Sequence, residues 1–117
     1  MLDTQTAAGK ITKLQNVGES LLQQLDYDLY DKWNSSTLRV LDLIFGQPSE
    51  PYMSFKFPGG GEAANSREGR VKNSISQKLK VLQFVQEDME SETLRPKLGW
   101  TNSAEEIDKA LSGLEMS

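Results

Sequence analysis

Apolar residues recur at steps of three and four along most of the chain, which is the spacing of amphipathic helices. The first such run predicts a helix over about 10–25, after a polar and frayed start at 1–9. Gly18 lies inside this run and disfavours the helix by about 1 kcal/mol relative to alanine. The apolar positions of the run are Ile11, Leu14, Val17, Leu21, Leu22 and Leu25.

A second helix is predicted up to Phe45, where Gly46 supplies a residue that tolerates the left-handed backbone of a helix end. Asp26 or Asp28 is expected to cap its first turn, because a carboxylate oxygen accepts an unpaired backbone N–H there. The polar stretch 34–37 leaves two readings open: the helix runs through it, or it breaks and restarts. The apolar side of this helix is formed by Leu29, Trp33, Val40, Leu41, Ile44 and Phe45.

A short helix is predicted after Ser49, a residue type that caps helices, with Pro51 in the first turn where a missing N–H does no harm. Tyr52 and Phe55 are expected to face inward from this helix. The alternative is an extended segment over 52–57, because apolar and polar residues alternate there. A single strand without a partner in the sequence argues against that alternative.

The longest helix is predicted over about 68–92, and we expect it to form the spine of the domain. Lys78 and Lys80 are expected on its solvent-facing side. A last helix is predicted to end near residue 112 and to start at Ser103, which matches a capping box with Glu106. The apolar stripe of the long helix is Val71, Ile75, Leu79, Leu82, Val85 and Met89, widened by Val81 and Phe84.

Together these elements predict an all-α fold, a compact bundle of four or five helices around one long central helix. The bundle domain is expected over 10–92, and the turn and short C-terminal helix of 93–117 are expected to pack on it. Trp33 and Trp100 are the only tryptophans. Both are expected to anchor the core, because an indole ring buries a large apolar area.

The residue types that the chain lacks exclude several classes of functional site. The 117 residues include no histidine and no cysteine, which excludes His-dependent triads, thiol nucleophiles, disulfides and zinc sites. We expect no catalytic residues, no metal site and no cofactor. Thirteen Lys and Arg against 17 Asp and Glu give a net charge of −4, which argues against a nucleic-acid partner. No apolar stretch reaches the roughly 18 residues that span a bilayer, and no signal-peptide pattern is found, so the expected location is the cytoplasm.

One segment suggests a ligand site. Consecutive backbone N–H groups of glycines can surround an anion, and a following helix N-terminus adds positive potential. The run is not a Walker loop, because no Gly-Lys-Ser or Gly-Lys-Thr follows it. It is read either as a nucleotide-binding loop or as a plain flexible linker. The residues concerned are Gly59, Gly60 and Gly61, followed by Arg67, Arg70 and Lys72.

Two further features predict contacts with another protein. Tyr27 and Tyr30 lie three residues apart on a predicted helix, and exposed tyrosines are common at interfaces. The acidic run with Glu87, Asp88 and Glu90 lies near a helix C-terminus, where the helix dipole disfavours negative charge. These five residues are therefore the predicted interface.

Eight residues between 33 and 55 have a familiar spacing: Trp33, Leu38, Leu41, Ile44, Phe45, Gly46, Ser49 and Phe55. This spacing resembles a short helical module of bacterial proteins that precedes TIR-like or nucleotide-binding effector domains in predicted defence or conflict systems. The later helix with Ile75, Leu79 and Leu82 is similar to the closing helix of that module. The resemblance covers roughly residues 10–92 and includes no catalytic motif. Because only a short helical tail follows here, we expect a cut-out domain, a stand-alone partner or a mimic that blocks a relative.

The sequence thus predicts a non-enzymatic helical protein-interaction or regulatory module of a prokaryotic or phage system. Its partner is expected to be another protein or a second copy of the chain, bound through helix faces. The alternative is a small protein that binds a nucleotide or cyclic-nucleotide signal through the glycine loop and the basic residues after it.

Overall fold

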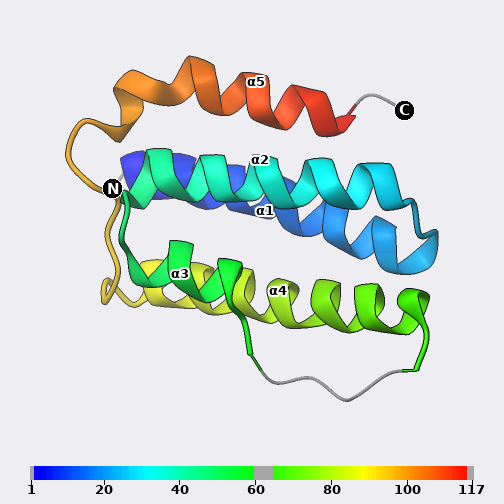
Figure 1. Ribbon diagram of the computed structural model, residues 1–117. Helices are drawn as coiled ribbons and strands as arrows, with labels where there is room; N and C mark the ends of the chain where they lie inside the picture. Colours follow the sequence, from blue (N-terminus) through cyan, green and yellow to red (C-terminus); the bar gives the residue numbers. More distant parts are fainter. Residues whose placement is uncertain (1, 60–64, 116–117) are drawn as a thin grey trace.

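The computed structural model describes residues 2–59 and 65–115, and over these residues the chain is helical without strands (Figure 1). The predicted all-α bundle is therefore confirmed. Five α-helices and one short 3₁₀ helix follow one another in the order α1 (Leu2–Gln23), α2 (Tyr27–Phe45), α3 (Glu50–Lys56), α4 (Arg67–Glu90), η1 (Trp100–Ser103) and α5 (Ala104–Glu115).

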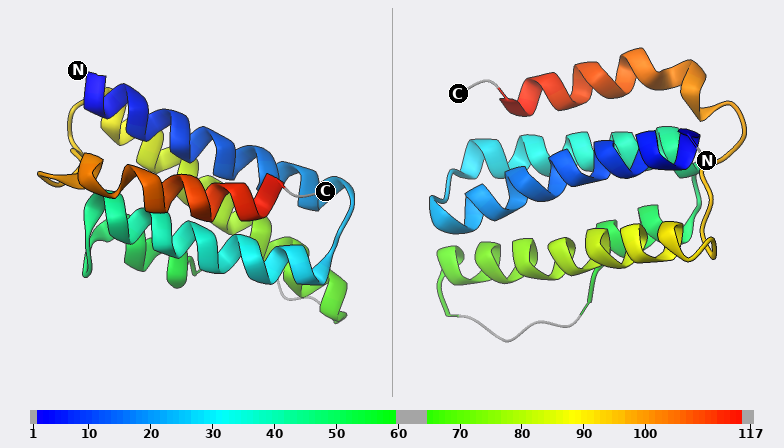
Figure 2. Two further views of the ribbon diagram at one scale, coloured as in Figure 1. Left: turned by 90° about the horizontal axis from the view of Figure 1, so that it is seen from above. Right: turned by 180° about the vertical axis from the view of Figure 1, so that it is seen from behind.

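The helices form three layers, with α1 and α2 in the middle, α5 on one side and the pair α3 and α4 on the other (Figures 1 and 2). The middle helix α2 packs on α1, α3 and α5, whereas α4 packs mainly on α1 and α3. With 24 residues α4 is the longest helix, as predicted. It forms an outer layer rather than the central spine that the sequence suggested, because its buried stripe is narrow and covers one side only.

The start of α1 corrects the prediction of a frayed segment at 1–9. The helix begins at Leu2 and ends at Gln23, so it is shifted toward the N-terminus relative to the predicted 10–25. Ala7 is fully buried against the core and Ala8 is half-buried. Alanine has the highest helix propensity and fits where helices approach closely, so this segment is helical although it offers few large apolar side chains.

The helix α2 runs through the polar stretch 34–37 without a break. Thr37 is fully buried and is part of the core side of this helix. Of the two predicted caps, Asp26 is the one used: its carboxylate accepts a hydrogen bond from the Leu29 backbone N–H at 3.1 Å. Gly46 ends the helix with a φ of 89°, a backbone conformation that glycine adopts without strain.

The segment after Gly46 is the predicted short helix and not a strand. The Ser49 side chain accepts a hydrogen bond from the Tyr52 backbone N–H at 3.3 Å, and Pro51 lies in the first turn. Phe55 is fully buried and Tyr52 is half-buried, as expected for the inward face. The helix α3 thereby lies beside α4 at the surface of the bundle (Figure 1).

Trp33 lies at the centre of the core, as predicted. Its indole N–H donates a hydrogen bond of 2.8 Å to the backbone carbonyl of Leu14 on α1. The ring of Phe55 on α3 meets the indole edge-on, with ring centroids 5.4 Å apart. One side chain of α2 therefore joins three helices, which fixes the position of α3 relative to α1.

The C-terminal helix α5 packs on α1 and α2 through Ile107, Leu111 and Leu114, all buried. Trp100 in η1 is buried beside it, as predicted. The predicted cap Ser103 is the last residue of η1, so α5 continues from a 3₁₀ turn instead of a free capping box. The helix runs on to Glu115, past the predicted end near residue 112.

Two ion pairs fasten α5 at its outer edge: Lys10 with Asp108 at 2.6 Å, and Arg39 with Glu106. Both pairs are partly exposed, so each contributes modestly to stability.

None of the helices in the described residues has an apolar stretch of the length that crossing a bilayer requires.

Candidate functional site

Large apolar side chains exposed to solvent gather on α3 and α4. Among the described residues, the exposed large hydrophobic side chains are Met53, Phe57, Phe84 and Leu98, and three of these four belong to α3, its C-cap or α4. Phe57 is 66% exposed and Phe84 is 61% exposed, values far above those of the core aromatic residues. Exposed large apolar side chains that adjoin a groove mark a surface that binds something apolar, and Phe84 is the one of these four that lines a groove.

A groove separates the two helices that carry these side chains. The helices α3 and α4 run in opposite directions (Figure 1), and the groove between them has a volume of about 530 Å³. Pro51 and Ser54 of α3 and Pro58 after its end line one wall, and the α4 wall repeats at helical spacing from Val81 to Asp88. The residues that line it are Glu50, Pro51, Ser54, Pro58, Val81, Phe84, Val85, Asp88, Thr93 and Leu94.

The loop after α4 contributes Thr93 and Leu94 to the lining of this groove. The Asp88 backbone carbonyl accepts hydrogen bonds from the N–H groups of Thr93 and Leu94, both at 3.0 Å. Glu92 has a φ of 62°, which turns the chain back toward the helix end. These contacts occupy the Asp88 carbonyl and hold Leu94 at the groove, while the Asp88 side chain is exposed.

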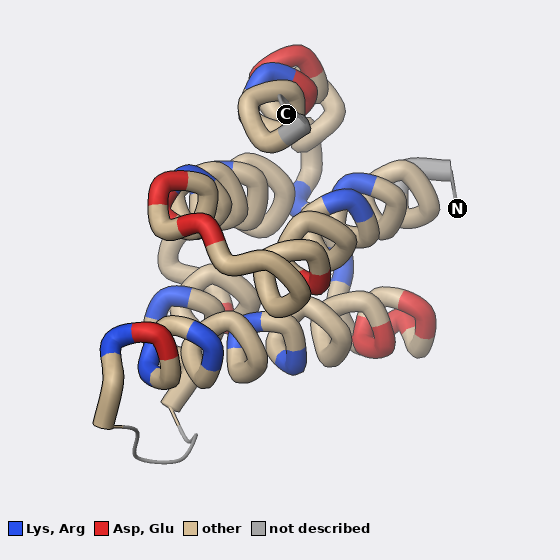
Figure 3. Tube along the Cα trace, turned by 90° about the vertical axis from the view of Figure 1, so that its right-hand side faces the viewer, with Lys and Arg blue, Asp and Glu red and all other residues tan. Residues whose placement is uncertain are grey.

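Charge is distributed unevenly along α4. Its first 14 residues, 67–80, contain five basic residues and one acidic residue, whereas residues 81–90 contain three acidic residues and no basic residue. Figure 3 shows acidic residues at one end of this helix and basic residues along the rest. The helix dipole favours negative charge near the N-terminus and positive charge near the C-terminus, and the net charge at each end of α4 has the opposite sign. The pattern is therefore not explained by the stability of the helix itself.

The predicted interface residues do not form one surface. The Tyr30 hydroxyl is hydrogen-bonded to the Ser74 hydroxyl at 2.8 Å, and its ring packs against Trp33, so Tyr30 joins α2 to α4 instead of facing solvent. Tyr27 is half-buried, with the Arg67 guanidinium 4.1 Å from the centre of its ring. The acidic residues Glu87, Asp88 and Glu90 are exposed at the other end of α4. Of the five predicted residues, only Asp88 lines the groove.

The predicted ligand residues are brought together only in part. Gly60 and Gly61 lie outside the described residues, and Gly59 is exposed after the end of α3. Arg67 and Arg70 are exposed at the start of α4, where Arg67 covers Tyr27. Lys72 faces Glu68 across one helical turn at 4.0 Å.

The N-terminus of α4 already has a cap. The Ser66 hydroxyl accepts a hydrogen bond from the Gly69 backbone N–H at 3.0 Å, and the Arg70 backbone N–H donates to the Ser66 carbonyl. Two of the N–H groups that an anion would use at this helix start are thereby paired.

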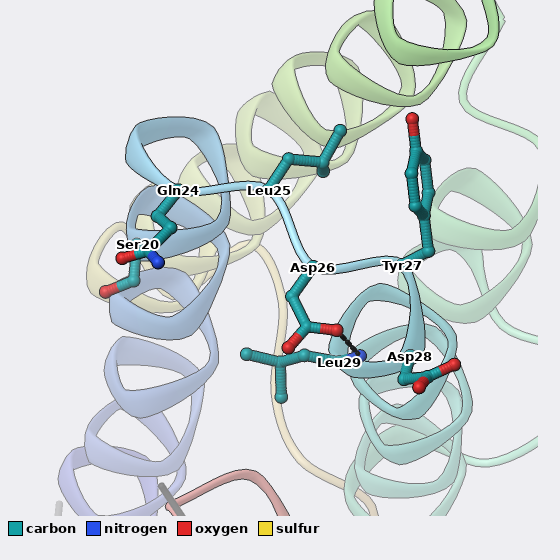
Figure 4. Close-up of a pocket in the computed structure, with 7 residues that line it drawn as sticks. All are labelled: Ser20, Gln24, Leu25, Asp26, Tyr27, Asp28 and Leu29. Carbon is teal, nitrogen blue, oxygen red and sulfur yellow. Dashed lines mark hydrogen bonds between the residues drawn. The ribbon is translucent and has the colours of Figure 1, made fainter.

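A broad, open depression of about 700 Å³ lies at the turn between α1 and α2 (Figure 4). In Figure 4 the Asp26 carboxylate points to the Leu29 backbone, which it caps. No basic side chain lines this depression, and two carboxylates do, so it does not suit an anionic ligand such as a nucleotide phosphate. Its lining residues are Ser20, Gln24, Leu25, Asp26, Tyr27, Asp28 and Leu29.

Lys78 is not on the solvent-facing side of α4, which corrects the prediction for this residue, whereas Lys80 is exposed as predicted. The Lys78 ammonium group donates a hydrogen bond of 2.7 Å to the Asn34 side-chain oxygen and lies 5.1 Å from the centre of the Phe55 ring. Burial lowers the pKa of Lys78, and the neighbouring Tyr30 hydroxyl acts in the opposite direction. The side chain joins α4 to α2 and α3.

Sequence reasoning missed Phe84 as a surface residue, because it placed this side chain in the apolar stripe of α4. At 100° per residue, Phe84 lies about 160° around the helix from Leu82, which is fully buried. This angle is the signal in the sequence that indicates an exposed side chain at position 84. Among the described residues, no group of three or more acidic residues is arranged to hold a metal ion.

The residues that carry the resemblance to the bacterial helical module are mostly core residues. Trp33, Leu41, Ile44 and Phe55 are fully buried, so their spacing reflects the packing of α2 and α3. Comparison of this chain with protein-family models, curated proteins and solved structures finds no match.

Proposed function

We propose that this protein is a non-enzymatic helical interaction module with a regulatory role, and that it binds its partner through the outer face of α3 and α4. The observation that carries the proposal is the exposed ring of Phe84, which lines the groove together with apolar residues of both helices, among them Pro51 and Val81. Covering such side chains removes apolar area from water and is favourable by about 25 cal/mol per Å².

The groove suits a helical segment with an apolar face. Its α4 wall repeats at helical spacing, and the step of seven residues from Val81 to Asp88 extends over about 10 Å, enough for two turns of a bound helix. The acidic side chains Glu50 and Asp88 lie at its edge, where they favour a partner with basic residues.

The wider setting of the proposal is a prokaryotic or phage defence system in the cytoplasm, as the resemblance of residues 33–55 to a bacterial helical module implies. In such a system a small module controls an effector by binding it. A partner helix that is bound in the groove is unable to contact other proteins, and binding controls the partner in this way.

An affinity capture with three baits from cells of the source organism tests the proposal. The baits are the unchanged chain, Phe84→Glu, and Lys13→Glu as a control, because Lys13 is exposed on α1. We expect one protein to be retained by the unchanged chain and by Lys13→Glu and to be lost with Phe84→Glu. Equal retention by all three baits would contradict the use of this face.

The alternative of nucleotide binding is tested with the same preparation. A ligand that binds the folded chain raises its melting temperature by mass action. If a nucleotide or cyclic nucleotide raises the melting temperature, and Arg70→Glu abolishes the rise, the protein is a signal binder. The docking proposal expects no change with any nucleotide.

A further inference from the structure

We infer that the partner bound by the α3–α4 face is a second copy of this chain, with the two α4 helices antiparallel across a two-fold axis near Phe84. This inference rests on the proposed function, because it uses the same surface and names its occupant. Two-fold dimers are the commonest protein assemblies, and such an interface must be complementary to itself.

The charge pattern of α4 has this self-complementarity. The helix is basic over 67–80 and acidic over 81–90. Each half opposes the helix dipole, so the arrangement destabilises the isolated helix. With a two-fold axis at Phe84, residues 78–90 of the two α4 helices overlap, and the acidic end of one helix lies beside the exposed Lys80 of the other.

The residues around Phe84 set the register of the pair. Lys80 and Asp88 each lie four residues from Phe84, which is about 6 Å along the helix axis in either direction. A two-fold axis at Phe84 therefore places Lys80 opposite the partner's Asp88 and Asp88 opposite the partner's Lys80. Both side chains are exposed, and neither forms an ion pair with another described residue of its own chain.

The apolar part of the face would be covered by the same arrangement. With the axis at Phe84, the two Phe84 rings meet and each α4 crosses the groove beside the other copy's α3. The half-buried Val81 lines the same groove as Phe84 and borders that contact. A chain of this size buries only about two-thirds of its unfolded surface, so added burial is worth more to it than to a large domain.

The outer side of this layer is also open to a second copy. Within the described residues, α4 packs on α1 and α3, and α3 packs on α2 and α4. No described helix covers the other side of the pair, as the views in Figures 1 and 2 show. The opposite layer, α5, lies across the bundle and is free to carry control substitutions.

Sedimentation velocity over a range of concentrations tests the inference on the full chain. We expect a dimer of twice the 13.1 kDa chain mass at high concentration. Phe84→Glu should weaken dimerisation by about thirtyfold or more, as expected for a central interface residue. Lys80→Glu and Asp88→Lys should each weaken it by about two- to tenfold.

The double variant Lys80→Glu with Asp88→Lys is the decisive one, because it exchanges the two charges and restores both pairs across the axis. Its dimer should be as stable as that of the unchanged chain. Lys13→Glu, with the same charge change on α1, should leave dimerisation unchanged. These substitutions all affect exposed side chains, and circular dichroism confirms that each variant is folded.

The outcomes separate this inference from the proposed function. A chain that stays monomeric at every concentration overturns the inference, while a foreign partner lost with Phe84→Glu still supports the proposed function. A dimer that survives Phe84→Glu overturns the inference alone, because the copies then meet through another face, whereas the proposed function fails only if the captured partner is retained by Phe84→Glu. A dimer weakened by each single charge change but not restored in the double variant overturns the antiparallel register at Phe84.

Discussion

Gly18 on α1 lies directly against the indole ring of Trp33 on α2. A Cβ atom at position 18 would lie 2.7 Å from a ring carbon of Trp33 and 2.6 Å from a methyl carbon of Leu79 on α4. Such distances are shorter than any real carbon contact, so three helices meet here at the closest approach that glycine allows. Glycine lowers the helix propensity of α1 at this position, but only glycine lets the three helices pack this closely.

The first prediction follows from this contact. Gly18→Ala should destabilise the protein by about 1–3 kcal/mol, because overpacking outweighs the gain of about 1 kcal/mol in helix propensity. Urea unfolding followed by circular dichroism measures the change. Gly9→Ala is the matched control: it lies in the same helix, and a Cβ atom there would have nothing within 4 Å. It should stabilise the protein by about 0.5–1 kcal/mol, and a loss of stability in both variants would contradict the packing argument.

The cap of α2 gives a second prediction. Asp26→Ala should lower the free energy of unfolding by about 1 kcal/mol, since the carboxylate accepts the Leu29 N–H at the helix start. Asp28→Ala should have a smaller effect, of about 0.3–1 kcal/mol, because that side chain acts only through the helix dipole. The comparison is made by thermal unfolding of both variants. An equal or larger loss with Asp28→Ala would contradict the assignment of the cap.

Lys78 gives a prediction about pH. Burial lowers the pKa of Lys78 in the folded chain below its ordinary value of 10.5. The unfolded chain therefore binds more protons as the pH rises through the lowered folded pKa toward 10.5, and the contribution of Lys78 to stability increases over that window. Below the folded pKa, both states are protonated and the cost of burying the charge is fully present.

The measurement is the free energy of unfolding against pH for the unchanged chain and for Lys78→Gln. The unchanged chain should gain stability relative to the variant as the pH is raised from neutral toward 10.5. Lys80→Gln, on the exposed side of the same helix, keeps Lys78 and serves as the control, so it should gain stability over this range as the unchanged chain does. A constant difference between the unchanged chain and Lys78→Gln would show that the ammonium group stays solvated.

The hydrogen bond from Trp33 to Leu14 gives a fourth prediction. Trp33→Phe should destabilise the protein by about 2–4 kcal/mol, because it leaves a cavity and removes the buried hydrogen bond that joins α2 to α1. Trp100→Phe is the comparison, since the Trp100 indole nitrogen is buried without a hydrogen-bond partner. Trp100→Phe should lower the free energy of unfolding by less than Trp33→Phe does, because only packing is lost. The two variants are compared by urea unfolding, and equal losses would contradict the role of the hydrogen bond.

Most of the fold could be predicted from the sequence, because its helices follow apolar spacing and local caps. Ser49 and Asp26 cap α3 and α2 at the positions that their residue types suggested. The start of α1 was missed, since Ala7 is buried by close approach and carries little apolar signal. The position of α4 in an outer layer was also missed, because the spacing of apolar residues gives the width of a stripe and not which helices cover it.

The candidate site was predicted less well than the fold. Tyr30 was expected at the surface, but only the packing of α2 on α4 reveals its hydrogen bond with Ser74. Phe84 was expected in the core, because a stripe read from apolar residues alone includes every phenylalanine near it. Asp88 was predicted as an interface residue and does line the groove. Which exposed residues face one another depends on tertiary packing, which helical periodicity does not specify.

Amide NMR spectra of the chain at increasing concentration locate the surface through which it associates, which we expect to be the α3–α4 face. Chemical shifts should change at residues 53–58 and 77–94 and stay constant on α5. The same residues should stop changing in Phe84→Glu. Shifts that change on α5 instead, or a spectrum that is the same at every concentration while the chain dimerises by sedimentation, would contradict it.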